Sequence, residues 1–275
     1  MTAENDSDGN PIQRLSELGS FGIPELSDRD LACALLPDLD YEAQLLAVRN
    51  LLRCHKHFDK ALSEEILQLE QHARQTKGLH NEHLVNEWVD HLHNSVYQDA
   101  AHSMAALGML APLMESIFYQ AFQAIRHHLS AIVNPECNHQ RWQQPAEDQW
   151  DCHFVWKSGR RSTNLVEGIL QLAEAVELSP YLPSALKFTL QALFEYRNKM
   201  FHCGFEWPIE ERQRFAMRID ASGWPADWFA KATTGGEPWI FYLTDTFALH
   251  CLDVIDSIIE GLGAFAREKL SREDK

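Results

Sequence analysis

The chain has 275 residues, of which 45% are hydrophobic, and its formal net charge is -16 at pH 7. This length and composition allow a sizeable buried core in one or two domains. The strong negative charge argues against broad, sequence-independent binding of duplex nucleic acid, because such binding needs many Lys and Arg contacts to phosphates. One local basic cleft, or a basic protein partner, remains compatible with this charge.

The sequence shows neither a targeting signal nor a membrane span. Its N-terminus lacks a basic run followed by apolar residues, and its six cysteines form no C-x-x-C pair. The most apolar stretch, residues 103–122, is interrupted by Pro112, Glu115 and Ser116 and falls short of the roughly 20 apolar residues that cross a bilayer. We therefore expect a cytoplasmic protein with reduced thiols and no membrane contact.

The first 94 residues predict an acidic N-terminal helical module. Residues 1–20 are polar and include Gly and Pro, which is typical of a disordered tail. Ser27 is suited to N-cap a helix that Pro37 ends. Apolar residues then recur at helical spacing in three stretches, which are residues 45–52, 62–74 and 81–92.

Residues 95–275 predict a second helical domain. A long helix is expected over 95–133, with a kink or break at Pro112. An irregular insertion follows over 134–163, in which DCHFVWKSGR predicts a short strand and turn. Asn164 with Glu167 resembles a capping box that opens a helix reaching Leu178.

Two further helices complete the expected all-α helical bundle. Pro183 fits the first turn of a helix that runs to Cys203, with Gly204 as its C′ residue. Residues 204–238 predict an irregular, Trp-rich connection, and residues 239–269 predict the last long helix.

The helix that ends at Cys203 carries the most informative polar residues of the chain. At 100° per residue, Arg197 falls on the same stripe as four apolar residues, which are Leu186, Leu190, Leu193 and Phe201. A charge on such a stripe needs a partner, so we expect Arg197 at an interface or cleft. Asn198 and His202 are i, i+4 neighbours, so the amide can orient the imidazole.

Arg197-Asn198, followed after three residues by His202, resembles the motif of the HEPN family, helical domains marked by Arg, often a polar residue, and His four to six residues later. The resemblance extends over about residues 95–270. The family that this chain resembles includes many metal-independent endoribonucleases that act as homodimers. The resemblance therefore implies RNA as substrate and a composite site to which both copies contribute. It also implies a role as a toxin or defence effector, which an inhibitory protein partner could restrain.

The resemblance implies catalytic roles for three residues. His202 would act as general acid or base, Arg197 would hold the scissile phosphate, and Asn198 would position either group. Neither a metal nor another cofactor is expected. Three basic residues beside Trp156 are candidates for substrate binding, namely Lys157, Arg160 and Arg161.

Several alternatives remain open at the level of sequence. Arg49-Asn50 with His55 is a competing version of the same motif, and the whole domain could be a non-catalytic HEPN-like module for protein interaction or regulation. Asp99 and Glu115 could pair with Arg197, although exposed helix carboxylates are the simpler expectation. The sharpest possible zinc set comprises Cys137, His139, Cys152 and His153.

Overall fold

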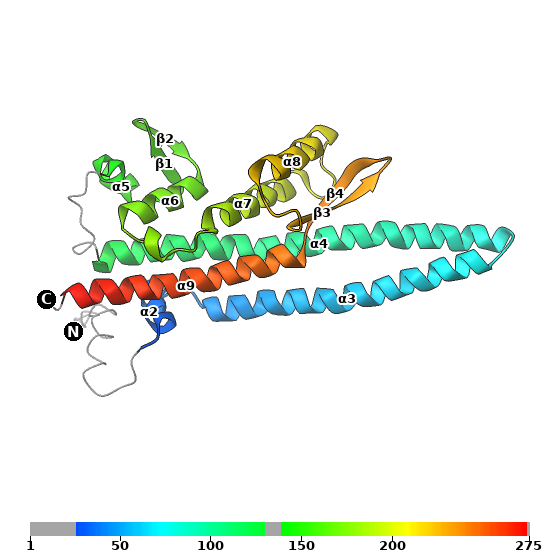
Figure 1. Ribbon diagram of the computed structural model, residues 1–275, viewed down its shortest axis with the longest axis horizontal. Coiled ribbons are helices and arrows are strands. Elements are labelled where there is room, and N and C mark those ends of the chain that lie inside the picture. Colours follow the sequence, from blue (N-terminus) through cyan, green and yellow to red (C-terminus); the bar gives the residue numbers. More distant parts are fainter. Residues whose placement is uncertain (1–25, 130–138, 274–275) are drawn as a thin grey trace, which may run out of the picture. The chain divides into compact units, whose positions relative to one another are not determined.

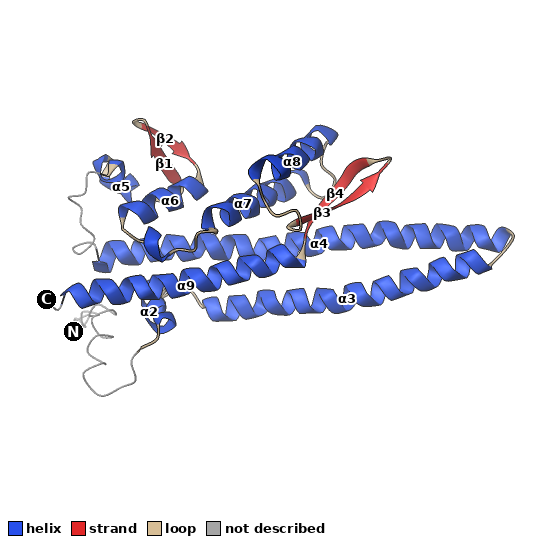
Figure 2. Cartoon of the chain, viewed as in Figure 1, coloured by secondary structure: helices blue, strands red, loops and turns tan. Residues whose placement is uncertain are grey.

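The computed structural model describes residues 26–129 and 139–273. Over these ranges the chain is mostly helical and contains two short antiparallel β-hairpins (Figures 1 and 2). The prediction of a helix-rich fold is confirmed, but the prediction of a strictly all-α fold is wrong. The hairpins form in segments that are rich in aromatic and β-branched residues, which favour strands. The tail expected at residues 1–20 lies outside the described residues.

The chain divides into two compact units, each assembled from separate stretches of sequence. Among the described residues, unit 1 combines 26–40, 113–129, 139–191 and 253–273, and unit 2 combines 41–112 and 192–252. The boundary expected after residue 94 falls inside α4 (Leu79–Ala124), which is one continuous helix. A cut at that point would therefore divide a helix rather than a linker.

Unit 1 surrounds an apolar core with short helical segments and one hairpin. Ser27 accepts a hydrogen bond from the backbone of Asp30, so the predicted cap of α2 (Asp28–Leu35) is confirmed. Parts of α4, of α7 (Leu186–Cys203) and of α9 (Asp245–Glu273) also belong to this unit. Its remaining elements are η2 (Ile125–Leu129), η3 (Gln140–Gln143), α5 (Ala146–Gln149), β1 (Phe154–Lys157), β2 (Arg160–Thr163), α6 (Leu165–Ala175) and η4 (Ser179–Tyr181). The β1–β2 hairpin confirms the strand and turn predicted from DCHFVWKSGR.

Two further helix ends predicted from the sequence, one in each unit, are also confirmed. Asn164 accepts a hydrogen bond from the backbone of Glu167 and thereby caps α6, although α6 ends at Ala175 rather than Leu178. α7 (Leu186–Cys203) stops where Gly204 adopts a φ of +70°, a conformation that favours glycine. Local capping chemistry therefore decides these ends.

Unit 2 contains a long antiparallel helical hairpin, formed by α3 (Tyr41–Gln75) and the part of α4 that precedes residue 113 (Figure 1). The stretches expected as separate helices merge: residues 45–52 and 62–74 both belong to α3, and α4 continues through Pro112. No helix in the described ranges has both the length and the apolar character that a membrane span requires.

The segment expected to be irregular, residues 204–238, instead supplies regular structure to unit 2. It holds α8 (Ile209–Ser222) and β3 (Phe229–Thr234), which pairs with β4 (Glu237–Leu243). α9 (Asp245–Glu273) consequently begins at Asp245 rather than Trp239. These elements share an aromatic cluster whose rings lie within contact distance of one another, comprising Tyr196, Trp207, Phe215, Trp224, Phe229, Phe241 and Phe247.

A close backbone contact in unit 1 depends on a glycine of α9. A Cβ built on Gly263 would lie 1.7 Å from the carbonyl oxygen of Asp28. Arg267, one turn later, donates to the Asp28 carboxylate at 2.9 Å and to the Leu26 carbonyl at 2.6 Å. The absence of a side chain at Gly263 therefore lets α2 lie directly against α9.

We expect Gly263→Ala to lower the free energy of unfolding by about 1–3 kcal/mol, because overpacking displaces α2. Gly108→Ala is the matched control in another helix interior, where the added methyl group would meet only the Phe201 ring at 4.0 Å. It should stabilise the protein by about 0.5–1 kcal/mol through helix propensity. Urea unfolding followed by circular dichroism measures both changes, and a Gly263→Ala protein as stable as the wild type would contradict the predicted contact.

Candidate functional site

The C-terminal end of α7, in unit 2, presents the predicted motif to solvent. Arg197 is partly exposed, and both Asn198 and His202 are exposed. The guanidinium of Arg197 donates a hydrogen bond to the side-chain oxygen of Asn198 at 3.1 Å. The three side chains are therefore accessible to a large ligand, and two of them are already in contact.

The predicted apolar stripe is only partly correct. Leu186, Leu190 and Leu193 are buried, but Phe201 is 55% exposed. The buried face continues instead through Tyr196 and Met200, which follow Leu193 at helical spacing. Arg197 thus lies at the edge of the buried face, with its guanidinium 5.9 Å from the centre of the Phe201 ring.

Tyr196 fixes the orientation of this end of α7. Its ring is fully buried in the aromatic cluster, and its hydroxyl donates to the carbonyl of Phe241 on β4 at 2.9 Å. Burial raises the pKa of this phenol, so it remains a neutral donor. Because Tyr196 points inward, its neighbours Arg197 and Asn198 are turned toward the surface.

The basic residues predicted to bind substrate lie on the β1–β2 hairpin of unit 1, and each is exposed. Lys157 forms an ion pair with Glu167 at 3.4 Å. Arg161 pairs with Asp148 at 3.3 Å, and its guanidinium lies 3.4 Å from the centre of the Phe154 ring. Two of the three cations therefore already have carboxylate partners.

The residues of the competing motif, Arg49 and His55, have different environments in unit 2. Arg49 is exposed, whereas the His55 ring stacks on His102 of α4 with a centroid separation of 3.5 Å. His55 Nε2 lies 3.7 Å from the Asp99 carboxylate, and His102 Nε2 lies 3.9 Å from the Asp245 carboxylate. Asp99 is thus placed beside His55, not Arg197.

The electrostatics of this cluster are perturbed. Burial and the nearby Asp59 carboxylate raise the pKa of Asp99 to about 6, with Asp245 adding to the effect against an opposing contribution from His55. Burial, followed by the positive charge of His55, lowers the pKa of His102 to about 4. His102 is therefore neutral near pH 7. Sequence spacing could not reveal this cluster, because Asp245 is remote from both histidines along the chain.

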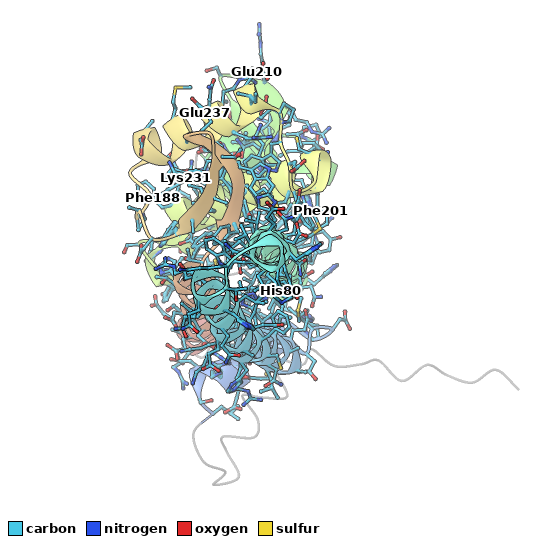
Figure 3. All side chains as sticks on the ribbon, turned by 90° about the vertical axis from the view of Figure 1, so that its right-hand side faces the viewer. His80, Phe188, Phe201, Glu210, Lys231 and Glu237 are labelled. Carbon is cyan, nitrogen blue, oxygen red and sulfur yellow. The ribbon has the colours of Figure 1, made fainter. Side chains whose placement is uncertain are left out.

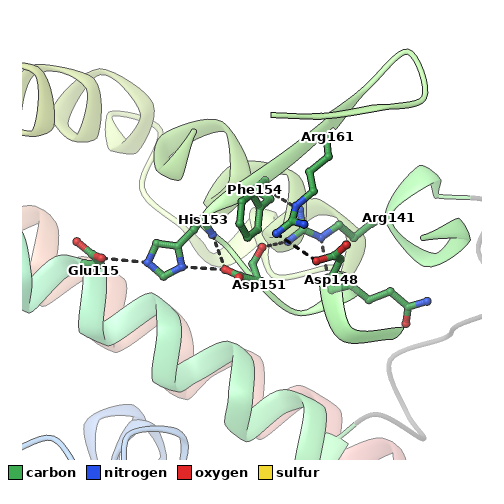
Figure 4. A network of polar contacts seen from close by, with 8 residues as sticks. Glu115, Arg141, Asp148, Asp151, His153, Phe154 and Arg161 are labelled. Atoms are coloured by element: carbon green, nitrogen blue, oxygen red, sulfur yellow. Dashed lines mark hydrogen bonds and ion pairs between the residues drawn. The ribbon is translucent and has the colours of Figure 1, made fainter. Parts of the chain in front are cut away.

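A second polar network, in unit 1, joins α4 to the segment before β1 (Figure 4). His153 places one ring nitrogen 3.0 Å from Glu115 and the other 2.8 Å from Asp151. Burial lowers the pKa of His153, but these hydrogen bonds outweigh it, and the pKa lies above its usual value. Glu115 therefore pairs with His153.

Arg141, a residue that the sequence pattern did not indicate, is completely buried beside this network. It donates to the backbone carbonyls of Gln149 at 2.7 Å and Phe154 at 2.6 Å, to that of Asp151, and to the side chain of Gln171 at 3.2 Å. These acceptors compensate for the loss of hydration and tie the segment before β1 to α6.

The possible zinc set is not gathered among the residues that the structure describes. Cys137 lies outside them, Cys152 is buried, and the ring of His153 is held by two carboxylates. Burial raises the pKa of the Cys152 thiol to about 12, which disfavours the thiolate that zinc needs. His139 lies 3.9 Å from Glu174.

Comparisons with known proteins give no relative for this chain. No protein-family model matches it, and neither a curated protein nor a solved structure does.

We expect the contribution of His153 to stability to depend on pH. Because folding raises its pKa, the stabilisation is complete below the unfolded value of about 6.5 and is lost as pH rises through the folded value. His153→Gln should therefore lower the unfolding free energy more at about pH 5.5 than at about pH 9. Urea unfolding at both pH values tests this, with the exposed His127→Gln of unit 1 as control. An equal loss at both values would contradict it.

Proposed function

We propose that this protein is a metal-independent endoribonuclease of the HEPN type, acting in the cytoplasm. The observation that carries the proposal is the accessible group at the end of α7, where Arg197 contacts Asn198 and His202 is exposed. These residue types supply the two functions that RNA cleavage needs, a cation for phosphate and a titratable group near neutrality.

The proposed reaction uses the 2′-hydroxyl of the RNA as nucleophile. His202 accepts the proton of this hydroxyl while water protonates the leaving 5′-oxygen, or it protonates the leaving oxygen while water accepts the proton of the hydroxyl. The 2′-oxygen forms a bond to phosphorus while the bond from phosphorus to the 5′-oxygen breaks. Arg197 holds the phosphate and stabilises the developing negative charge, and Asn198 orients Arg197 through their hydrogen bond. The products are a 2′,3′-cyclic phosphate and a 5′-hydroxyl.

A homodimer is needed to complete this site. Arg197 and His202 are five positions apart on α7, which separates them by about 140° around the axis and about 7.5 Å along it. One copy therefore does not direct both side chains at one phosphate. We place Arg197 of one copy opposite His202 of the partner subunit. The exposed Phe201 between them, which lies over Gly108, supports contact between copies at this face.

The strong negative charge of the chain fits tight control of such an activity. An acidic surface limits unselective RNA binding and suits a basic inhibitory protein. A toxin or defence effector would require such restraint. The alternative function is a non-catalytic interaction module. In that case Phe201 and Arg197, which lie side by side at the end of α7, would contact a partner protein.

The proposal predicts that the purified dimer cleaves RNA in the presence of EDTA. We expect His202→Ala to lower the rate by about 10²–10⁴-fold through loss of proton transfer. Arg197→Ala should lower it by about 10²–10³-fold through loss of charge stabilisation. Cleavage of a labelled RNA, with identification of the cyclic phosphate end, measures these changes.

Two matched controls keep this test specific. Arg49→Ala removes the arginine of the competing motif, and His57→Ala removes another exposed histidine of unit 2; both should cleave like the wild type. Circular dichroism and light scattering verify the fold and the dimer of each variant. Loss of cleavage in Arg49→Ala alone would transfer the activity to the other motif, and a folded wild-type dimer without cleavage would favour the interaction module.

A further inference from the structure

The polar cluster around His55 brings together donors from three helices of unit 2. His55 belongs to α3, His102 and Asp99 belong to α4, and Asp245 is the first residue of α9. The ligand atoms of His55, His102 and Asp245 all lie within 4.8 Å of one another. Among the described residues, it is the one group of three or more His, Cys, Asp or Glu side chains whose ligand atoms lie close enough together to hold a metal ion.

The distances in this cluster do not suit direct hydrogen bonds. The separations of 3.7 Å for His55 and Asp99, and of 3.9 Å for His102 and Asp245, exceed the range of about 2.7–3.2 Å for such bonds. Two donors, each about 2.1 Å from one ion, lie about 3.4 Å apart in tetrahedral geometry. The ligand atoms of His55, His102 and Asp245, which lie within 4.8 Å of one another, therefore have to approach by up to about 1.4 Å to share one cation. The two imidazoles are stacked with 19° between their planes, so binding also requires the rings to tilt until both nitrogens point at the ion.

Burial and charge also favour a cation at this position. The side chain of His102 is 6% exposed and that of His55 is 17% exposed, so both imidazoles are largely removed from water. Two carboxylates, Asp99 and Asp245, face them, and Asp59 lies near enough to affect Asp99. A divalent ion would offset this concentration of negative charge, and the 45% exposure of the Asp245 side chain leaves a path for its entry.

We propose that His55, His102 and Asp245, with Asp99 as the adjacent fourth donor, bind a divalent first-row transition metal. Two imidazole nitrogens and carboxylate oxygens form a donor set that suits Zn²⁺ and related ions. The ion would connect α3, α4 and the start of α9, and thereby stabilise unit 2. This site goes beyond the proposed RNA cleavage, which uses other residues and no metal.

The experiment measures Zn²⁺ binding to the full-length chain after removal of metal with a chelator. Isothermal titration calorimetry and elemental analysis should give about one tightly bound Zn²⁺ per chain, and Zn²⁺ should raise the Tm because it binds the folded state. His55→Asn and Asp245→Asn, which change the more exposed ligands, should each weaken binding at least about tenfold. Binding of Co²⁺ should add the visible absorption of a low-coordinate site to the wild type but not to these variants.

His57→Asn is the matched control, because His57 is an exposed histidine on the same helix as His55. It should bind Zn²⁺ like the wild type. Circular dichroism of the metal-free proteins verifies that each variant is folded, and Asp245→Asn provides the test if His55→Asn is not. The proposal is overturned if the folded wild type takes up no stoichiometric Zn²⁺. It is equally overturned if the folded ligand variants retain wild-type affinity, since the ion would then lie elsewhere.

Discussion

The buried phenol of Tyr196 donates a hydrogen bond to the carbonyl of Phe241, and the accessible end of α7 depends on this interaction. The ring packs against Trp207, Phe215 and Phe229 in the aromatic cluster of unit 2, so α7 cannot rotate without exposing it or leaving the carbonyl unsatisfied. Ser103 provides a second connection to the same strand, because its hydroxyl accepts a hydrogen bond from the backbone of Leu243 at 2.8 Å. This fixed orientation directs Arg197, Asn198 and His202 outward. Phe201 is also exposed by this arrangement, which explains why an aromatic residue lies at the surface beside the motif.

The excess of carboxylates has a structural use in both units. In unit 1, two carboxylates hold the ring of His153, and Figure 4 shows how this brings the segment before β1 to α4. In unit 2, Asp99 and Asp245 approach a stacked pair of imidazoles at longer distances. In the first arrangement the separations are those of hydrogen bonds, while in the second they are longer, and there we propose a metal ion. The α7 motif differs from both, because Arg197 contacts an amide and an aromatic ring. Figure 3 shows the Phe201 side chain at the surface of unit 2, where a second copy could reach it.

Local chemistry explains which features were predictable from sequence. The caps at Ser27 and Asn164 and the helix end at Gly204 follow from side chains a few residues away, and the β1–β2 turn follows from the pair Ser158-Gly159. The sequence did not predict the β3–β4 hairpin, because its aromatic residues are also compatible with a helix. Their strand conformation depends on tertiary contacts with Tyr196, whose ring packs on Phe229 and whose hydroxyl donates to the Phe241 carbonyl. The predicted breaks between separate helices, in what are α3 and α4, were wrong. Packing within the long helical hairpin stabilises polar stretches in which apolar residues recur only weakly at helical spacing. The exposure of Arg197 and the assembly of the His55 cluster depend on contacts between distant segments, which spacing along the chain does not encode.

The central claim is that Arg197 of one copy and His202 of the partner subunit form one cleavage site. Mixed dimers test it most directly, with one copy carrying Arg197→Ala and the other His202→Ala, isolated through two different affinity tags. In such a dimer one of the two symmetric sites keeps both residues, so cleavage should return to about half the wild-type rate per dimer, while each parental variant stays inactive. Mixed dimers as inactive as their parents would contradict a site shared in this way.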